Sequence, residues 1–230
     1  MQPMTKDTDN MPATRPEMSR HSFLGIELEI AGGVLIPREE TELLGRTAIG
    51  IVANSTSPLV IDMCCGSGNL GLAIASAVPS AKVMSADLTD ETVNAARHNT
   101  QRLGLSDRVE VYQGDLFAAF GDKSPAGKVD LVVCNPPYIS AKRLHETLAH
   151  LLEEEPREAF DGGPFGISIL QRLVRDSADM LRSGGSLAFE FGEGQHHQVA
   201  HLLSRSGAYE EISFVDNELG IARVAIARKK

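Results

Sequence analysis

Two spacings of hydrophobic residues alternate along this chain of 230 residues. Short apolar runs typical of buried strands lie at residues 58–63, 81–86, 109–112, 129–134, 186–191, 211–215 and 222–227. Apolar residues recur at helical spacing in residues 41–52, 70–78, 89–103, 167–181 and 195–204. This alternation predicts an α/β fold with a doubly wound, mostly parallel seven-stranded sheet, whose ligands bind at the carboxyl ends of the strands.

The N-terminal part of the chain does not follow this alternation. Residues 1–21 show no hydrophobic period and mix Met, Pro, Thr, Asp and Arg, which predicts a disordered tail. Residues 23–36 contain two short apolar runs around Gly32 and Gly33, a pattern that favours a β-hairpin turning at these glycines. We therefore expect a tail at residues 1–21 and a single folded domain at residues 22–230.

Composition and charge narrow the classes of function. With 42% hydrophobic residues, the chain can bury a substantial core. A formal net charge of -9 lacks the positive field that holds a phosphate backbone, which disfavours nucleic acid as a partner. No apolar stretch approaches the roughly 20 residues needed to cross a bilayer, and the first residues lack the apolar centre of a signal peptide, so the sequence predicts a cytoplasmic protein.

Cysteines and histidines are spaced in a way that does not indicate a metal site. Cys64 and Cys65 are adjacent and Cys134 ends an apolar run, so reduced, buried thiols are expected. His197 and His201 share a predicted helical face, but no third ligand is spaced to join them. The sequence predicts no metal cofactor.

A glycine-containing segment stands where the strand at 58–63 passes into a helix. Glycines there allow a ligand to approach the backbone, and the helix N-terminus offers unpaired N–H groups to a carboxylate. The segment predicts a cofactor loop made of Asp62, Cys64, Cys65, Gly66, Ser67 and Gly68.

Acidic residues follow the next two predicted strands. Asp87 ends the strand at 81–86, about twenty residues beyond the loop, where a carboxylate accepts hydrogen bonds from a ribose diol. A nicotinamide cofactor would satisfy these features as well. Asp115 follows the strand at 109–112 and is placed to accept from an adenine amine, with Leu116 and Phe117 near the ring. Three polar groups at successive strand ends therefore indicate an adenosine-containing cofactor.

The strand at 129–134 runs directly into Asn135, Pro136, Pro137 and Tyr138. Paired prolines cannot continue a β-ladder, so this segment predicts a rigid corner at the carboxyl end of the sheet. The lone pair of an amide or aryl amine is delocalised, and an enzyme that alkylates it must hold both N–H hydrogens. The side-chain oxygen of Asn135 and the carbonyl of Pro136 are the predicted acceptors, and Tyr138 is predicted to pack against the flat group.

With these motifs the chain resembles the HemK/PrmC family, which methylates the side-chain amide of glutamine in proteins such as peptide-release factors. The resemblance covers residues 23–228, and its specific segments are 34–42, 135–138, 155–156, 162–163, 190–192 and 216–224. It implies a class I methyltransferase fold, with S-adenosylmethionine as cofactor and S-adenosylhomocysteine as product. It also implies an acceptor that bears an NH2 group.

The chain departs from the family at several positions. Full-length members carry a helical N-terminal domain, whereas we expect only a tail before the hairpin here, as in shorter relatives that use a small zinc-containing adaptor protein. Glu39 replaces a usual proline, and Leu116 stands where an aromatic residue often covers the adenine. Cys64 replaces the first loop glycine, and because a side chain disfavours positive φ we expect a differently shaped loop there.

Other functions stay open at this stage. The acceptor is a glutamine in a protein or, alternatively, a small amide, amine or peptide of a biosynthetic pathway. Adenine in nucleic acid is a further alternative, because adenine methyltransferases share the Asn-Pro-Pro-Tyr corner. A binding module that senses the cofactor without catalysis is the alternative outside the enzymes. The acidic residues 153–155 would border the substrate channel or face solvent, and Glu190 is a candidate for supporting the site from behind.

Overall fold

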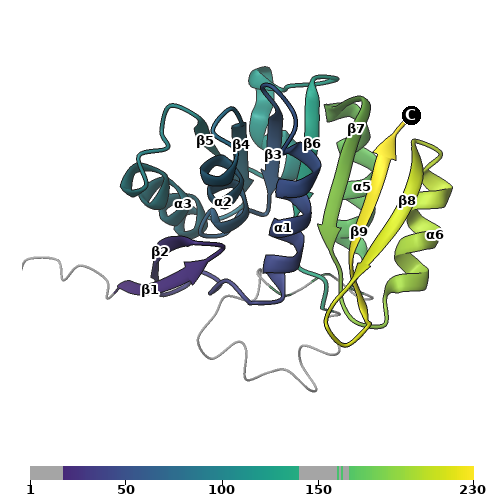
Figure 1. The fold of residues 1–230 in the computed structure, drawn as a ribbon, viewed down its shortest axis with the longest axis horizontal. Coiled ribbons are helices and arrows are strands. Elements are labelled where there is room, and N and C mark those ends of the chain that lie inside the picture. Colours follow the sequence, from purple (N-terminus) through teal and green to yellow (C-terminus); the bar gives the residue numbers. More distant parts are fainter. Residues whose placement is uncertain (1–17, 140–159, 161, 163–165) are drawn as a thin grey trace, which may run out of the picture.

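The computed structural model describes residues 18–139, 160, 162 and 166–230. A seven-stranded sheet forms its centre, with the strand order β5-β4-β3-β6-β7-β9-β8 (Figure 1). The five strands from β5 to β7 run parallel, and β9 is antiparallel to both of its neighbours. Their bounds are β3 Leu59–Met63, β4 Lys82–Asp87, β5 Val109–Gln113, β6 Val129–Cys134, β7 Leu181–Glu190, β8 Tyr209–Asp216 and β9 Ala222–Lys229. The predicted fold class is confirmed.

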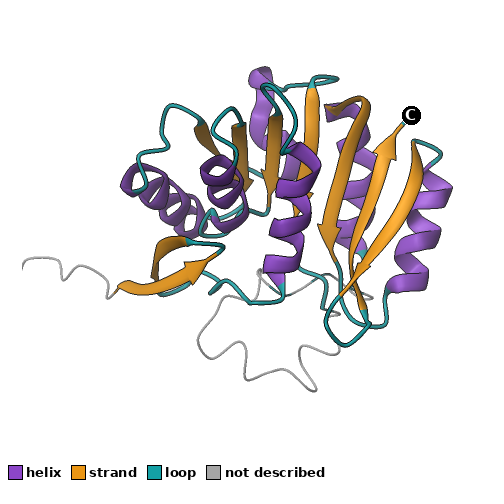
Figure 2. Ribbon diagram, in the orientation of Figure 1, coloured by secondary structure: helices purple, strands orange, loops and turns teal. Residues whose placement is uncertain are grey.

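Helices cover both faces of the sheet (Figure 2). Successive strand residues point to opposite faces, so Val60 packs into one core while Ile61 packs into the other. The first core joins α1 (Thr41–Val52), α2 (Asn69–Ala77) and α3 (Asp90–Arg102) to one face. The second joins the 3-10 helix η1 (Leu116–Lys123), α5 (Ser168–Met180) and α6 (His196–Ser206) to the other. Apolar runs without alternation therefore become strands buried on both faces.

The N-terminal hairpin is present, but its predicted turn was wrong. Strand β1 (Met18–Phe23) pairs antiparallel with β2 (Ile26–Ala31). The chain turns at Leu24 and Gly25, which both adopt positive φ, and not at Gly32 and Gly33. The side chains of β2 alternate between the core and the surface, which the run of apolar residues after Gly33 does not do. Strand β1 begins within the segment predicted as a tail, and residues 1–17 lie outside the described residues.

The strand order brings the two predicted motifs together. Strands β3 and β6 are parallel neighbours at the centre of the sheet, and Met63 pairs with Cys134. The cofactor loop after β3 and the Asn135 corner after β6 therefore leave the same edge side by side. The order of the strands reverses at this point, which is where doubly wound sheets bind their ligands. No helix in the described part of the chain is long and apolar enough to cross a membrane.

Candidate active site

The loop after β3 adopts a left-handed backbone at three positions. Cys64 has a φ of 58°, Gly66 of 55° and Gly68 of 85°. Cys64 adopts this conformation although it carries a side chain, and a glycine would adopt it more easily. Its side chain is half-buried and packs against the second core, a contact that offsets part of the cost of positive φ.

Hydrogen bonds join this loop to the end of the neighbouring strand. The backbone N–H of Cys65 donates to the carbonyl of Ala86 over 3.1 Å, and that of Gly66 donates to Oδ2 of Asp87 over 2.8 Å. The other carboxylate oxygen of Asp87 accepts from Thr92 Oγ1 at 2.9 Å and from the N–H of Leu88 at 2.7 Å. Asp87 is thus held rigidly at the strand end beside the loop.

Asp62 lies fully buried beneath the loop. Its Oδ2 accepts from the backbone N–H of Gly71 over 2.9 Å, in the first turn of α2. Oδ1 of Asp62 has no partner, and neither have the buried hydroxyls of Ser67 and Ser85. Burial raises the pKa of Asp62 to about 7, the negative charge of Asp87 adds to the rise, and the Gly71 N–H opposes it. The loop therefore rests on buried polar atoms that have no hydrogen-bond partner within the structure.

The third predicted strand end is arranged differently. Asp115 is largely exposed and pairs with Arg172, with Nη2 to Oδ2 at 2.9 Å. Leu116 has a φ of 50° and is buried with Phe117 and Phe120 in the second core. The carboxylate is available at the surface, while the apolar side chains after it hold η1 against the sheet.

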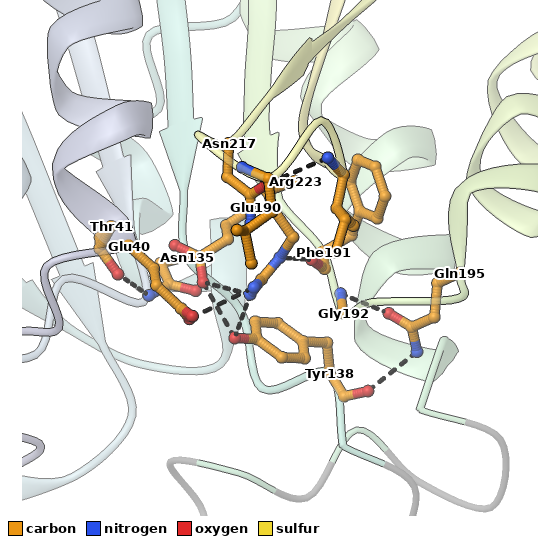
Figure 3. A network of polar contacts seen from close by, with 12 residues as sticks. Glu40, Thr41, Asn135, Tyr138, Glu190, Phe191, Gly192, Gln195, Asn217 and Arg223 are labelled. Carbon is orange, nitrogen blue, oxygen red and sulfur yellow. Dashed lines mark hydrogen bonds and ion pairs between the residues drawn. The ribbon is translucent and has the colours of Figure 1, made fainter.

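The Asn135 corner is fixed by the start of α1. Nδ2 of Asn135 donates to the hydroxyl oxygen of Thr41 over 3.0 Å, across 94 positions of sequence (Figure 3). Thr41 is buried and is the first residue of α1. Because the amide nitrogen is engaged by Thr41, the amide oxygen of Asn135 is the atom left for other partners.

Tyr138 is held at both ends. Its hydroxyl donates to Oε1 of Glu190 over 2.9 Å and accepts from Nη2 of Arg223 over 3.2 Å (Figure 3). Its backbone carbonyl accepts from Nε2 of Gln195 over 2.9 Å, while Oε1 of Gln195 accepts from the N–H of Gly192. The position of the aromatic ring is therefore set by the tertiary structure.

A cluster of charges lies behind Tyr138. Arg223 reaches Glu190 at 3.5 Å and Glu40 at 3.3 Å, and its Nε donates to the carbonyl of Phe191. Glu190 has only 2% of its surface exposed, and burial raises its pKa, against the opposing effect of the nearby Thr41 and Tyr138 hydroxyls and of the charge of Arg223. Burial and the neighbouring charge of Glu190 also raise the pKa of Tyr138, so its hydroxyl stays protonated.

A pocket of about 460 Å³ opens beside this cluster. Its lining joins the segment before α1, the corner and the end of β7, namely Leu35, Arg38, Glu39, Glu40, Asn135, Pro136, Tyr138, Ile139, Phe160 and Glu190. Asn135, Pro136 and Tyr138 were predicted as site residues from the sequence, and the structure brings them together here. The residues of the cofactor loop lie outside this lining, at the adjacent strand end.

Sequence reasoning gave no role to Thr41, Glu40 or Arg223. These residues lie in segments 34–42 and 216–224, which resemble the family, and this resemblance was the signal that could have identified them. The acidic residues 153–155 lie outside the described residues. Among the residues that the structure describes, no group of three or more His, Cys, Asp or Glu side chains is arranged to hold a metal ion.

Comparisons with known proteins agree with this geometry. Residues 49–163 match the family model described as the methyltransferase small domain. A release factor glutamine methyltransferase of Clostridium botulinum is 33% identical over 208 residues, which is 90% of this chain and 72% of the relative. The 4-amino-L-phenylalanine/4-methylamino-L-phenylalanine methyltransferase of Streptomyces pristinaespiralis is 35% identical over 83% of this chain and 65% of the relative. The structure of M. jannaschii TYW2 in complex with AdoMet shares the fold, with a TM-score of 0.59, 11% identity and coverage of 96% and 89%.

Proposed function

Because this chain belongs to the family of the release factor glutamine methyltransferases, we propose that it methylates the side-chain amide nitrogen of glutamine in a protein acceptor. The methyl donor is S-adenosylmethionine, which supplies a methyl group on a positively charged sulfur. The observation that carries the proposal is the orientation of Asn135, whose amide nitrogen donates to Thr41, so that its amide oxygen is the acceptor left for a ligand of the pocket that Asn135 lines.

The residues at the carboxyl ends of β3, β4 and β5 fit such a cofactor. Unpartnered buried oxygens of Asp62 and Ser67 suit the ammonium and carboxylate of an amino acid group, next to the N-terminus of α2. We propose that Asp87, at the end of β4, binds the ribose hydroxyls, and that Asp115 and Leu116, after β5, bind the adenine. The residues proposed to bind the cofactor are Asp62, Cys64, Cys65, Gly66, Ser67, Gly68, Asp87, Asp115, Leu116 and Asn135.

The corner residues act on the acceptor by orienting it. We propose that the amide oxygen of Asn135 and the carbonyl of Pro136 accept the two N–H hydrogens, and Pro137 keeps the turn rigid. Tyr138, fixed at its hydroxyl and its backbone carbonyl, packs against the plane of the amide. The nitrogen lone pair then faces the donor, a positioning effect worth up to roughly 7–11 kcal/mol. The proton is lost to water after nitrogen has formed its new bond.

The experiment that tests this function uses purified enzyme, methyl-labelled S-adenosylmethionine and a peptide that carries one glutamine. Label on the glutamine side chain, located by mass spectrometry, is the expected result. A matched peptide with asparagine at that position is the control, because its amide is carried on a shorter side chain and reaches less far into the pocket. Absence of label with the glutamine peptide and with intact protein acceptors would contradict the proposal.

An aryl amine is the second candidate acceptor. The relative from Streptomyces pristinaespiralis is named for a flat aromatic amine, and the pocket here has apolar walls from Leu35, Ile139 and Phe160. Parallel reactions with 4-amino-L-phenylalanine and with the glutamine peptide separate the two candidates. A higher kcat/KM for 4-amino-L-phenylalanine than for the glutamine peptide would make aryl amines, and not glutamine, the substrate class.

A further inference from the structure

The amide of an asparagine side chain has two chemically opposite ends. Its oxygen accepts hydrogen bonds and its nitrogen donates them, so the end that faces the acceptor decides which group can bind. In the structure Nδ2 of Asn135 is engaged by the Thr41 hydroxyl at 3.0 Å, and the oxygen is left for the pocket (Figure 3). Thr41 is 1% exposed and the first residue of α1, so water cannot replace it.

A threonine hydroxyl could also donate to the oxygen of Asn135, which would turn the amide around. The hydroxyl has one proton, and the direction of the bond depends on where this proton points. Glu190 is 2% exposed, and its Oε2 has no hydrogen-bond partner. The Thr41 hydroxyl forms no hydrogen bond with this carboxylate in the structure, but its proximity lowers the pKa of Glu190. When the proton points to Glu190, only lone pairs face Asn135, and Asn135 must present its NH2 group.

Glu190 is itself held in an orientation that keeps Oε2 available. Its Oε1 accepts from the Tyr138 hydroxyl at 2.9 Å and from Arg223 at 3.5 Å. These donors occupy one oxygen and favour the ionised carboxylate, against the burial that raises the pKa of Glu190. The remaining buried oxygen would lose solvation without a partner, and a small shift of the Thr41 hydroxyl supplies one.

We propose that Thr41, held by Glu190, is a positioning residue that fixes the amide orientation of Asn135 and so makes the site select an NH2 group over an oxygen isostere. This inference rests on the proposed function, because it takes glutamine as the acceptor. A glutamate side chain has the same shape but places oxygens against the amide oxygen of Asn135. The site rejects it because two acceptors face each other without a proton between them.

The test measures dissociation constants of two peptides that differ only in glutamine or glutamate at the acceptor position, with S-adenosylhomocysteine present. Wild-type protein is expected to prefer the glutamine peptide. Thr41→Val keeps the shape and removes the hydroxyl, so Asn135 can turn and the preference is expected to fall by about tenfold, the effect of about one hydrogen bond. Thr41→Ser keeps the hydroxyl and is expected to retain the preference.

Thr47→Val is the matched control, since it makes the same change on the same helix where the hydroxyl donates only to the carbonyl of Leu43. Unchanged preference in Thr41→Val would overturn the inference while leaving glutamine methylation intact. Lack of methylation by the wild-type protein would instead overturn the proposed function, and the inference with it. If Thr41→Val fails to fold, Glu190→Gln tests the same point. Its carboxamide can donate to Thr41, turn the hydroxyl toward Asn135 and reduce the preference.

Discussion

Replacing Arg223 by methionine is expected to leave a buried carboxylate without its partner. Arg223 is 8% exposed and Glu190 2%, with 3.5 Å between Nη2 and Oε1. Removing one member of a buried ion pair typically costs about 3–5 kcal/mol, because the other charge stays desolvated. In a chain of this size each kcal/mol corresponds to roughly 2–4 °C, so Arg223→Met is expected to lower the melting temperature by about 10 °C.

The sign of the pH dependence follows from Glu190. Its pKa is already raised above 4.5 by burial, and losing the charge of Arg223 raises it further. A raised acid pKa means that the folded state is penalised above the unfolded pKa, and the penalty grows until the folded pKa is reached. The destabilisation caused by Arg223→Met is therefore expected to be larger at pH 8 than at pH 5.

A double-mutant cycle measures this interaction by urea unfolding at pH 8. In the Glu190→Gln background, Arg223→Met leaves no buried carboxylate without its partner, so the substitution is expected to cost only about 1 kcal/mol, the value of an ordinary hydrogen bond. The coupling free energy should then be at least about 2 kcal/mol. Additive effects of the two substitutions, or equal destabilisation at pH 5 and pH 8, would refute the view that the pair is electrostatically linked.

Three further outcomes are expected. Asn135→Ala should lower kcat at least about tenfold, with little change in the cofactor affinity measured by calorimetry. Asp87→Ala should weaken cofactor affinity more than it lowers kcat. The reverse pattern would contradict the proposed division of roles. Gly71→Ala should destabilise by about 1–3 kcal/mol in urea unfolding, because its Cβ would lie 2.8 Å from Oδ2 of Asp62. Gly50→Ala, with no atom within 4 Å, should instead stabilise by about 0.5–1 kcal/mol. The free energy of unfolding of Asp62→Asn should increase relative to wild type as pH rises from 4 to about 7, because the raised pKa of Asp62 penalises the charged carboxylate of the wild type in this range. A difference between the two proteins that does not change with pH would contradict the raised pKa.

Local patterns were sufficient for most of the fold. Residues 129–134 were predicted as a strand and 41–52 as a helix, with the bounds that the structure shows. Residues 129–134 form an apolar run typical of a strand buried on both faces, and residues 41–52 carry apolar residues at helical spacing. The hairpin turn was predicted at the wrong place because Gly32 and Gly33 are as good a local turn signal as Leu24 and Gly25. The choice between these two turns depends on which side chains reach the core.

The sequence by itself determined the seven-stranded α/β fold, the glycine loop after β3 and the Asn-Pro-Pro-Tyr corner, since each is a property of neighbouring residues. Only the tertiary structure decided how the corner is held. Thr41 meets Asn135 across 94 positions, and Arg223 meets Tyr138 across 85. The physical reason is that a hydrogen bond depends on separation in space, which strand order and helix packing set and which no local period records.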